Sequence, residues 1–110
     1  MTTTRVRVCS VGDVPSGEAR RFPVDGRLVA VVNLGDDGFR AVDAVCSHAH
    51  SYLDEGEVDP DDQTLECPKH GSTFDLNSGA PRSLPATEPV ATFSVTTEND
   101  DVYIEVPADE

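Results

Sequence analysis

Two short segments of the chain contain the side chains best suited to bind a metal. The first has Cys46 and His48, separated by one residue, and the second has Cys67 and His70, separated by two. Thiolate sulfur and imidazole nitrogen are ligands that suit transition metals rather than magnesium or calcium. The pattern therefore predicts a metal centre that takes one thiolate and one imidazole from each segment.

The spacing of these ligands bears on which metal they bind. Structural zinc is usually held by ligand pairs with about two to five residues between the two ligands, so that both side chains of a pair reach one ion. Cys46 and His48 are closer together than that, which is poor for zinc. If each segment instead sends its cysteine to one iron and its histidine to the other, the spacing suits a [2Fe–2S] cluster clamped between two loops. A colourless structural zinc module that binds other proteins is the alternative.

Alternating apolar residues on both sides of this region predict the β-strands that position it. We expect strands, in chain order, at residues 5–9, 27–34, 39–45, 91–96 and 102–106. The segment 27–34 is apolar without alternation, which indicates a strand buried on both faces. Turn residues at 35–38 and 98–101 separate the neighbouring strands and favour antiparallel hairpins.

The middle of the chain has a different composition. Residues 46–89 are rich in Pro, Gly, Asp, His and Cys, and they contain no long apolar run. Such a stretch is dominated by loops, and a bound metal would order it. We therefore predict a single domain over 1–110, with a β base at about 1–44 and 90–107 and a cluster-binding subdomain at about 45–89.

The chain is strongly acidic. Its 110 residues include 21 Asp and Glu against 8 Lys and Arg, which gives a net charge of −13. Such a field repels nucleic acid and anionic lipid and favours partners with a basic face. Residues 54–62 form an acidic spacer between the two ligand pairs, either a docking surface or an ordinary solvated loop. Solubility or adaptation to high salt would also explain the overall charge.

No membrane or export signal is recognisable in the sequence. The longest uninterrupted apolar run is Leu28 to Val32, whereas a membrane helix needs roughly 20 apolar residues. The first residues have neither an apolar signal core nor a twin-arginine pair. We therefore expect a cytoplasmic protein, where thiolate ligands stay reduced. Cys9, on the arginine side of its alternating strand, is expected to be an unligated thiol.

The ligand segments resemble a known family. Cys46-Ser-His48, followed by Cys67-Pro-Lys-His70, resembles the C-x-H and C-x2-H pattern of Rieske proteins. Further similarity is to the ferredoxin components of bacterial ring-hydroxylating dioxygenases, at residues 55–58, 74–75, 77–79 and 84–86. The resemblance covers roughly residues 5 to 107 and is strongest from 45 to 89.

The resemblance implies a fold and a cofactor. Members of this family are all-β, with three antiparallel sheets and a loop-rich cluster-binding subdomain at one tip. One [2Fe–2S] cluster per chain would be held by Cys46, His48, Cys67 and His70. A third loop with Pro85 would cover the cluster, and the Ser72 hydroxyl would bond a bridging sulfide. Phe74 stands where high-potential members have a tyrosine, so we expect the low-to-middle Rieske range, which begins at roughly −150 mV.

The resemblance also implies a function. The chain would be an electron-transfer protein, without catalysis of its own, that carries one electron from a reductase to a ring-hydroxylating or other Rieske oxygenase. The oxygen-activating iron of such oxygenases needs two further histidines and a carboxylate, and only three histidines are present in all. An accessory role in iron–sulfur cluster assembly or redox sensing is the alternative function.

Overall fold

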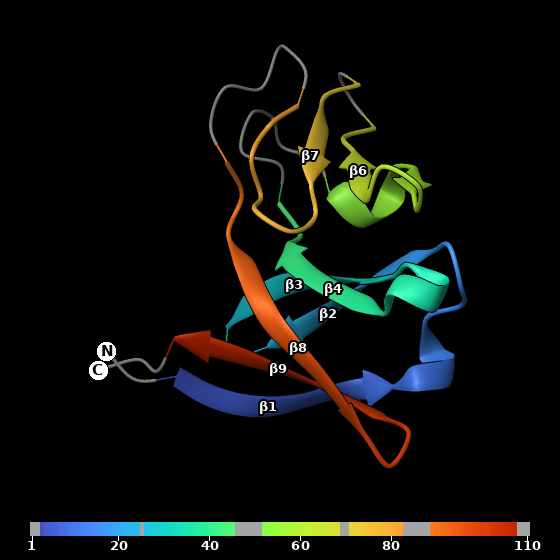
Figure 1. The fold of residues 1–110 in the computed structure, drawn as a ribbon. Helices are drawn as coiled ribbons and strands as arrows, with labels where there is room; N and C mark the ends of the chain where they lie inside the picture. Colours follow the sequence, from blue (N-terminus) through green and yellow to red (C-terminus); the bar gives the residue numbers. More distant parts are fainter. Residues whose placement is uncertain (1–2, 25, 46–51, 69–70, 83–88, 108–110) are drawn as a thin grey trace.

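The computed structural model of the chain describes residues 3–24, 26–45, 52–68, 71–82 and 89–107. Within these ranges lie nine β-strands and three short 3₁₀ helices, and no α-helix (Figure 1). The elements are, in chain order, β1 (Thr3–Ser10), η1 (Val11–Asp13), β2 (Ala19–Val24), β3 (Arg27–Asn33), η2 (Gly35–Asp37), β4 (Phe39–Asp43), η3 (Leu53–Glu55), β5 (Val58–Asp59), β6 (Thr64–Glu66), β7 (Thr73–Asp75), β8 (Thr92–Glu98) and β9 (Asp101–Pro107).

Six of these strands form one antiparallel sheet, called the base sheet here, in the order β1-β9-β8-β4-β3-β2. Its two halves lie in different layers, because β8 changes partner along its length. Thr92 and Phe93 pair with β4, and Ser94 to Glu98 pair with β9. Figure 1 shows β8 crossing from the β2-β3-β4 layer to the β1-β9 layer.

The remaining strands form the insert sheet, in the order β5-β6-β7. It lies on the opposite side of the β2-β3-β4 layer from β1 and β9 (Figure 1). The all-β expectation is therefore confirmed. The three expected sheets occur as three layers, two of which β8 links into one curled sheet. The division into a β base and a cluster-binding subdomain stays a prediction.

Strand β3 separates two apolar cores. Val29 and Val31 belong to the base core, whereas Ala30 and Val32 belong to the loop-side core, and all four side chains are fully buried. The sequence prediction of a strand buried on both faces is thus confirmed. The base core consists of Cys9, Val14, Val24, Val29, Val31, Ala41, Val102, Ile104 and Val106. The loop-side core consists of Ala19, Ala30, Val32, Leu34, Val42, Ala44, Leu53, Leu65, Cys67, Phe74, Leu76 and Val90.

The other expected strands are also present. The hairpin of β3 and β4 and the closing hairpin of β8 and β9 have the predicted turns between them. Strand β2 was not predicted from the sequence, because Arg20, Arg21 and Pro23 interrupt any apolar alternation. Proline is tolerated there because β2 lies at the edge of the base sheet, where an absent N–H breaks no ladder.

The side chain of Cys9 lies on the opposite face from the one its sequence position suggests. The pairing of β1 with β9 shifts between Arg7 and Cys9, so that Val8 is the extra residue of a β-bulge. A bulge reverses the alternation beyond it. Cys9 is therefore not on the arginine side but in the base core, where 3% of it is exposed. Burial, with the nearby Asp13 carboxylate, raises the pKa of the Cys9 thiol to about 11.

None of the described residues forms a helix that is long and apolar enough to cross a membrane.

The raised pKa of Cys9 predicts a thiol that resists alkylation. The thiolate is the reactive form, and a thiol with pKa about 11 is ionised in only about one molecule in a thousand at pH 8. We expect the rate of iodoacetamide labelling at Cys9 in the folded, metal-loaded protein to rise with a midpoint near pH 11. Peptide mass spectrometry would measure it, with Cys9→Ala as the control. A midpoint near pH 9 would contradict the burial.

Candidate metal centre

The structure describes two of the six predicted site residues. Cys67 directly follows β6, Ser72 directly precedes β7, and both are fully buried. The other four predictions lie outside the described residues: Cys46, His48, His70 and Pro85. What the structure adds is the framework from which the ligand-bearing segments start and end.

The second predicted ligand pair belongs to the segment between β6 and β7, whose last paired residues are Glu66 and Thr73. Two backbone hydrogen bonds close this loop. The N–H of Cys67 donates to the Ser72 carbonyl at 2.6 Å, and the N–H of Gly71 donates to the Cys67 carbonyl at 2.9 Å. Gly71 has a φ of 77°, which favours glycine. The N–H and the carbonyl of Cys67 therefore both form hydrogen bonds within this loop.

In the sequence, the first predicted ligand pair lies between two segments that are hydrogen-bonded to each other. Val45 and Tyr52 form an antiparallel bridge, and the N–H of Leu53 donates to the Ala44 carbonyl at 2.7 Å. Ala44 in turn donates its N–H to the Leu28 carbonyl at 3.0 Å. The described residues on either side of positions 46–51 are therefore joined to each other, and Ala44 joins them to β3.

The predicted third loop is anchored to the insert sheet. Phe74 and Pro81 form an antiparallel bridge, and the N–H of Arg82 donates to the Thr73 carbonyl at 2.7 Å. On the other side, the N–H of Val90 donates to the Gly79 carbonyl at 2.9 Å. A Cβ on Gly79 would lie 2.0 Å from the Val90 carbonyl oxygen, so only glycine permits this approach.

The turn before the third loop is capped by a carboxylate. Asp75 accepts hydrogen bonds from the backbone N–H groups of Asn77 at 2.7 Å and Ser78 at 3.1 Å. Arg82 lies 3.4 Å from the same side chain. These N–H groups, Asn77 first, lower the pKa of Asp75 below its ordinary value, with Arg82 adding to the effect. The turn therefore holds an ionised carboxylate at neutral pH.

All three loops start from the loop-side core. This core includes Ala44 and Leu53 beside the first loop, Cys67 and Phe74 beside the second, and Val90 beside the third. A cluster thiolate needs shielding from water, and the Cys67 side chain has that shielding. The donor set of two thiolates and two imidazoles is the one that a histidine-ligated [2Fe–2S] cluster requires. The residues present therefore fit such a cluster.

One close contact joins the two ligand segments. Gly56 follows η3, and a Cβ there would lie 1.6 Å from the Glu66 carbonyl oxygen and 3.2 Å from Cδ of Pro68. The chain that leaves the first loop thus passes directly against the residues on either side of Cys67. Residues 55–58 resemble the family, but the contact between Gly56 and Glu66 was not predicted. A glycine directly after the 3₁₀ segment was the available signal.

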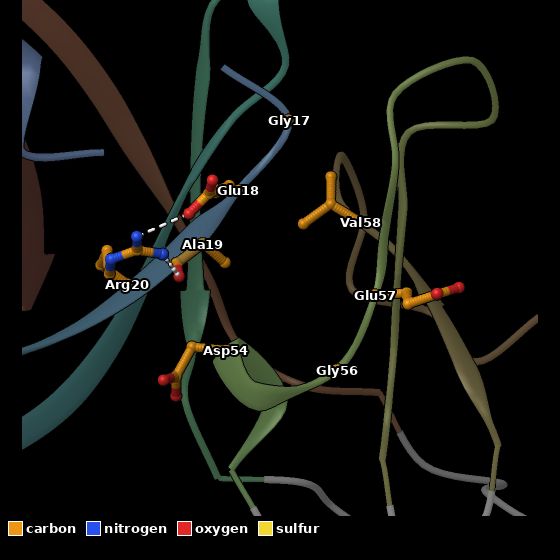
Figure 2. Close-up of a pocket in the computed structure, with 8 residues that line it drawn as sticks. All are labelled: Gly17, Glu18, Ala19, Arg20, Asp54, Gly56, Glu57 and Val58. Carbon is orange, nitrogen blue, oxygen red and sulfur yellow. Dashed lines mark hydrogen bonds and ion pairs between the residues drawn. The ribbon is translucent and has the colours of Figure 1, made fainter. Parts of the chain in front are cut away.

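The acidic spacer does not lie wholly on the surface. Glu57, Asp59, Asp61 and Asp62 are exposed, whereas the Asp54 side chain is 12% exposed. Asp54 lies at a surface groove between the start of β2 and residues 56–58 (Figure 2). Burial raises the pKa of Asp54 above its ordinary value, and the charge of Arg21 opposes this rise. Asp54 is therefore a structural carboxylate, and the other carboxylates of the spacer face solvent.

Comparison with known proteins identifies the family. The family model described as the Rieske [2Fe-2S] domain matches residues 4–94. The ferredoxin subunit of 3-phenylpropionate/cinnamic acid dioxygenase from Escherichia coli (strain K12) is 40% identical over 103 residues, which is 94% of each chain.

Solved structures give the same family. The ferredoxin of carbazole 1,9a-dioxygenase from Nocardioides aromaticivorans IC177 is 36% identical, with a TM-score of 0.86 over 92% of this chain and 96% of that one. A complex of reduced oxygenase and oxidised ferredoxin in carbazole 1,9a-dioxygenase contains a chain that is 36% identical, with a TM-score of 0.81 over 91% of each chain. The protein described here thus belongs to the Rieske [2Fe–2S] domain family, and it is a ferredoxin-type electron carrier with a [2Fe–2S] cluster as its cofactor.

Proposed function

We propose that the chain is the ferredoxin component of a ring-hydroxylating dioxygenase system in the cytoplasm, taking one electron from a reductase and delivering it to an oxygenase. The observation that carries this proposal is the match over 94% of both chains to a dioxygenase ferredoxin subunit. The solved complex of an oxygenase with a ferredoxin 36% identical to this chain supports the oxygenase as the acceptor. An assembly or sensing role has no comparable support.

We propose that Cys46 and Cys67 bind one iron of the cluster and that His48 and His70 bind the other. When bound, the cluster supplies a site that takes up and releases one electron. The buried backbone turn at Cys67 holds one ligand away from water, which favours retention of the metal. Ser72, buried in the same turn, is proposed to tune the potential, and Pro85 is proposed to shield the cluster.

We further propose that the exposed part of the acidic spacer contacts a basic face of the partner. Asp61 and Asp62 are exposed at the turn between β5 and β6, and their backbone N–H groups donate to Asp59 at 3.1 and 3.2 Å. Asp59 thus fixes this turn, while the next two carboxylates remain available to a partner. Charges at the rim of an interface act mainly on the association rate.

The ligand proposal predicts the behaviour of two variants. Cys46→Ser and His70→Ala each remove one of four ligands, so we expect both proteins to lose the cluster. The measurement is the EPR spectrum of the dithionite-reduced protein, with visible absorption and iron analysis. The wild type should give the low average g value of a histidine-ligated [2Fe–2S] centre. A normal spectrum from either variant would contradict the ligand set, and bound zinc in a colourless wild type would contradict the electron-carrier function.

The contact at Gly56 predicts a loss of cluster without a change of ligand. A Cβ in Gly56→Ala would collide with the Glu66 backbone, which cannot move without moving Cys67. We expect iron content to fall to about half or less, because close-packed backbone has no room for the added methyl group. Gly12→Ala is the matched control, since nothing lies within 4 Å of a Cβ at Gly12. Full iron content in Gly56→Ala would argue against this coupling of the two loops.

The docking proposal predicts a specific effect of spacer charge. We expect Asp61→Asn/Asp62→Asn to slow electron transfer from the reduced protein to an oxidised Rieske oxygenase by about threefold at low salt, with less effect at high salt. Stopped-flow absorbance with the carbazole 1,9a-dioxygenase oxygenase would measure the rate. Asp36→Asn/Asp100→Asn removes two exposed carboxylates elsewhere and should leave the rate unchanged. Equal slowing by both pairs would mean that only net charge matters and would contradict the docking proposal.

A further inference from the structure

Arg21, in edge strand β2, contacts the segment that leaves the first ligand-bearing loop. Its guanidinium carbon lies 3.8 Å from the centroid of the Tyr52 ring, which is a cation–π contact. Its Nη1 atom lies 3.5 Å from a carboxylate oxygen of Asp54 and 3.6 Å from one of Glu55. Arg21 thus contacts three of the four residues 52–55. The fourth, Leu53, has its side chain buried in the loop-side core.

Part of this contact is shielded from water. Nη1 of Arg21 and Oδ1 of Asp54 are both buried, and neither has a hydrogen-bond partner among the described residues. A separation of 3.5 Å is too long for a hydrogen bond, so the two groups interact as charges. Charges interact more strongly where water is excluded. Burial raises the pKa of Asp54, and the charge of the Arg21 guanidinium is the largest of the effects that oppose this rise.

The segment that Arg21 contacts belongs to the framework of the metal centre. Tyr52 pairs with Val45 across the ends of residues 46–51, which contain Cys46 and His48. The same segment continues through η3 to Gly56, which lies against the carbonyl of Glu66 just before Cys67. Displacement of residues 52–55 from β2 would therefore disturb both ligand-bearing loops.

We propose that Arg21 is a positioning residue of the iron–sulfur centre. By holding Tyr52, Asp54 and Glu55 against β2, it fixes the first ligand-bearing loop and thereby sets the midpoint potential and the retention of the cluster. The inference rests on the proposed ligands Cys46 and His48. It assigns to a base-sheet residue, 25 positions before the first ligand, an influence on the metal centre.

The chemistry of the contact requires arginine. A guanidinium is planar, so it can stack on an aromatic ring and still present its edge to carboxylates, whereas an ammonium cannot do both. Arg21→Lys keeps the charge and loses the stacking, and Arg21→Gln loses both. Arg20→Gln is the matched control, because it removes the same charge from the adjacent residue. Arg20 is exposed, and its ion pair and hydrogen bond are with Glu18 and the Ala19 carbonyl. Its charge also acts on Asp54, less strongly than that of Arg21, so Arg20→Gln removes a nearby charge without removing the contacts to residues 52–55.

The experiment compares these variants as cluster-loaded proteins. Cluster release is followed as loss of visible absorbance in the presence of an iron chelator, and the midpoint potential by spectroelectrochemical titration. We expect Arg21→Gln to release the cluster about tenfold faster than wild type, because it loses one stacked, partly desolvated cation. The release rate of Arg21→Lys should lie between those of wild type and Arg21→Gln. Arg21→Gln should also lower the midpoint potential and alter the EPR g values, whereas Arg20→Gln should match wild type in release rate and g values.

Two outcomes of this comparison would overturn the proposal. Equal changes in Arg20→Gln and Arg21→Gln would mean that only the overall electrostatic field acts on the cluster. A wild-type release rate and wild-type spectra in Arg21→Gln would mean that the contact does not position the loop.

If Arg21→Gln fails to fold, Tyr52→Leu provides the second test. It should reproduce the Arg21→Lys effect and add nothing in the Arg21→Lys background, since both remove the same contact. Additive effects would again overturn the proposal.

Failure of the ligand assignment would be recognised separately. A Cys46→Ser protein that keeps a normal Rieske spectrum would contradict the proposed ligands and remove the basis of the inference. A cluster-free Cys46→Ser protein together with an unaffected Arg21→Gln protein would reject the positioning role of Arg21 alone. The two proposals therefore have distinguishable outcomes.

Discussion

The rest of the structure depends on the burial of β3 on both faces. Alternate residues of this strand enter the base core and the loop-side core, so a displacement of β3 would disturb both. A chain of 110 residues without tryptophan has only a modest apolar core, and dividing it in two leaves each part small. The loop-side core surrounds Cys67 and the ends of the three loops. Metal binding and packing of the base sheet are therefore energetically linked through one strand.

Much of the base sheet could be predicted, because its strands are encoded locally. The alternation of β8 and β9 and the apolar run of β3 are visible in any short window of the sequence. Strand β2 could not be found in this way, since arginines and a proline occupy it and its pairing with β3 defines it. The inward position of Cys9 depends on a bulge opposite β9, almost a hundred residues away in sequence. Strands β5, β6 and β7 are too short to show a period.

The metal centre shows the same division between local and distant information. Its proposed ligand pairs could be predicted from the sequence because each pair spans only three or four residues. The contacts that hold the loops join residues far apart, such as Arg21 with Tyr52 and Gly79 with Val90, and spacing within one segment cannot reveal them.

The acidic residues of the chain have more than one role. Asp13, Asp43, Asp59 and Asp75 accept backbone N–H groups at turns, so part of the negative charge serves local structure.

The strand order has a consequence for synthesis on the ribosome. In the base sheet β1 is an edge strand whose hydrogen-bonded neighbour is β9, and β9 reaches β4 only through β8 (Figure 1). The amino-terminal strand therefore has no partner within this sheet until residues 101–107 have left the exit tunnel. During translation β1 would remain an open edge with its valines uncovered, which is the kind of surface that chaperones bind. Closure of the base, and stable uptake of iron and sulfide with it, would then be a late event in the life of the nascent chain.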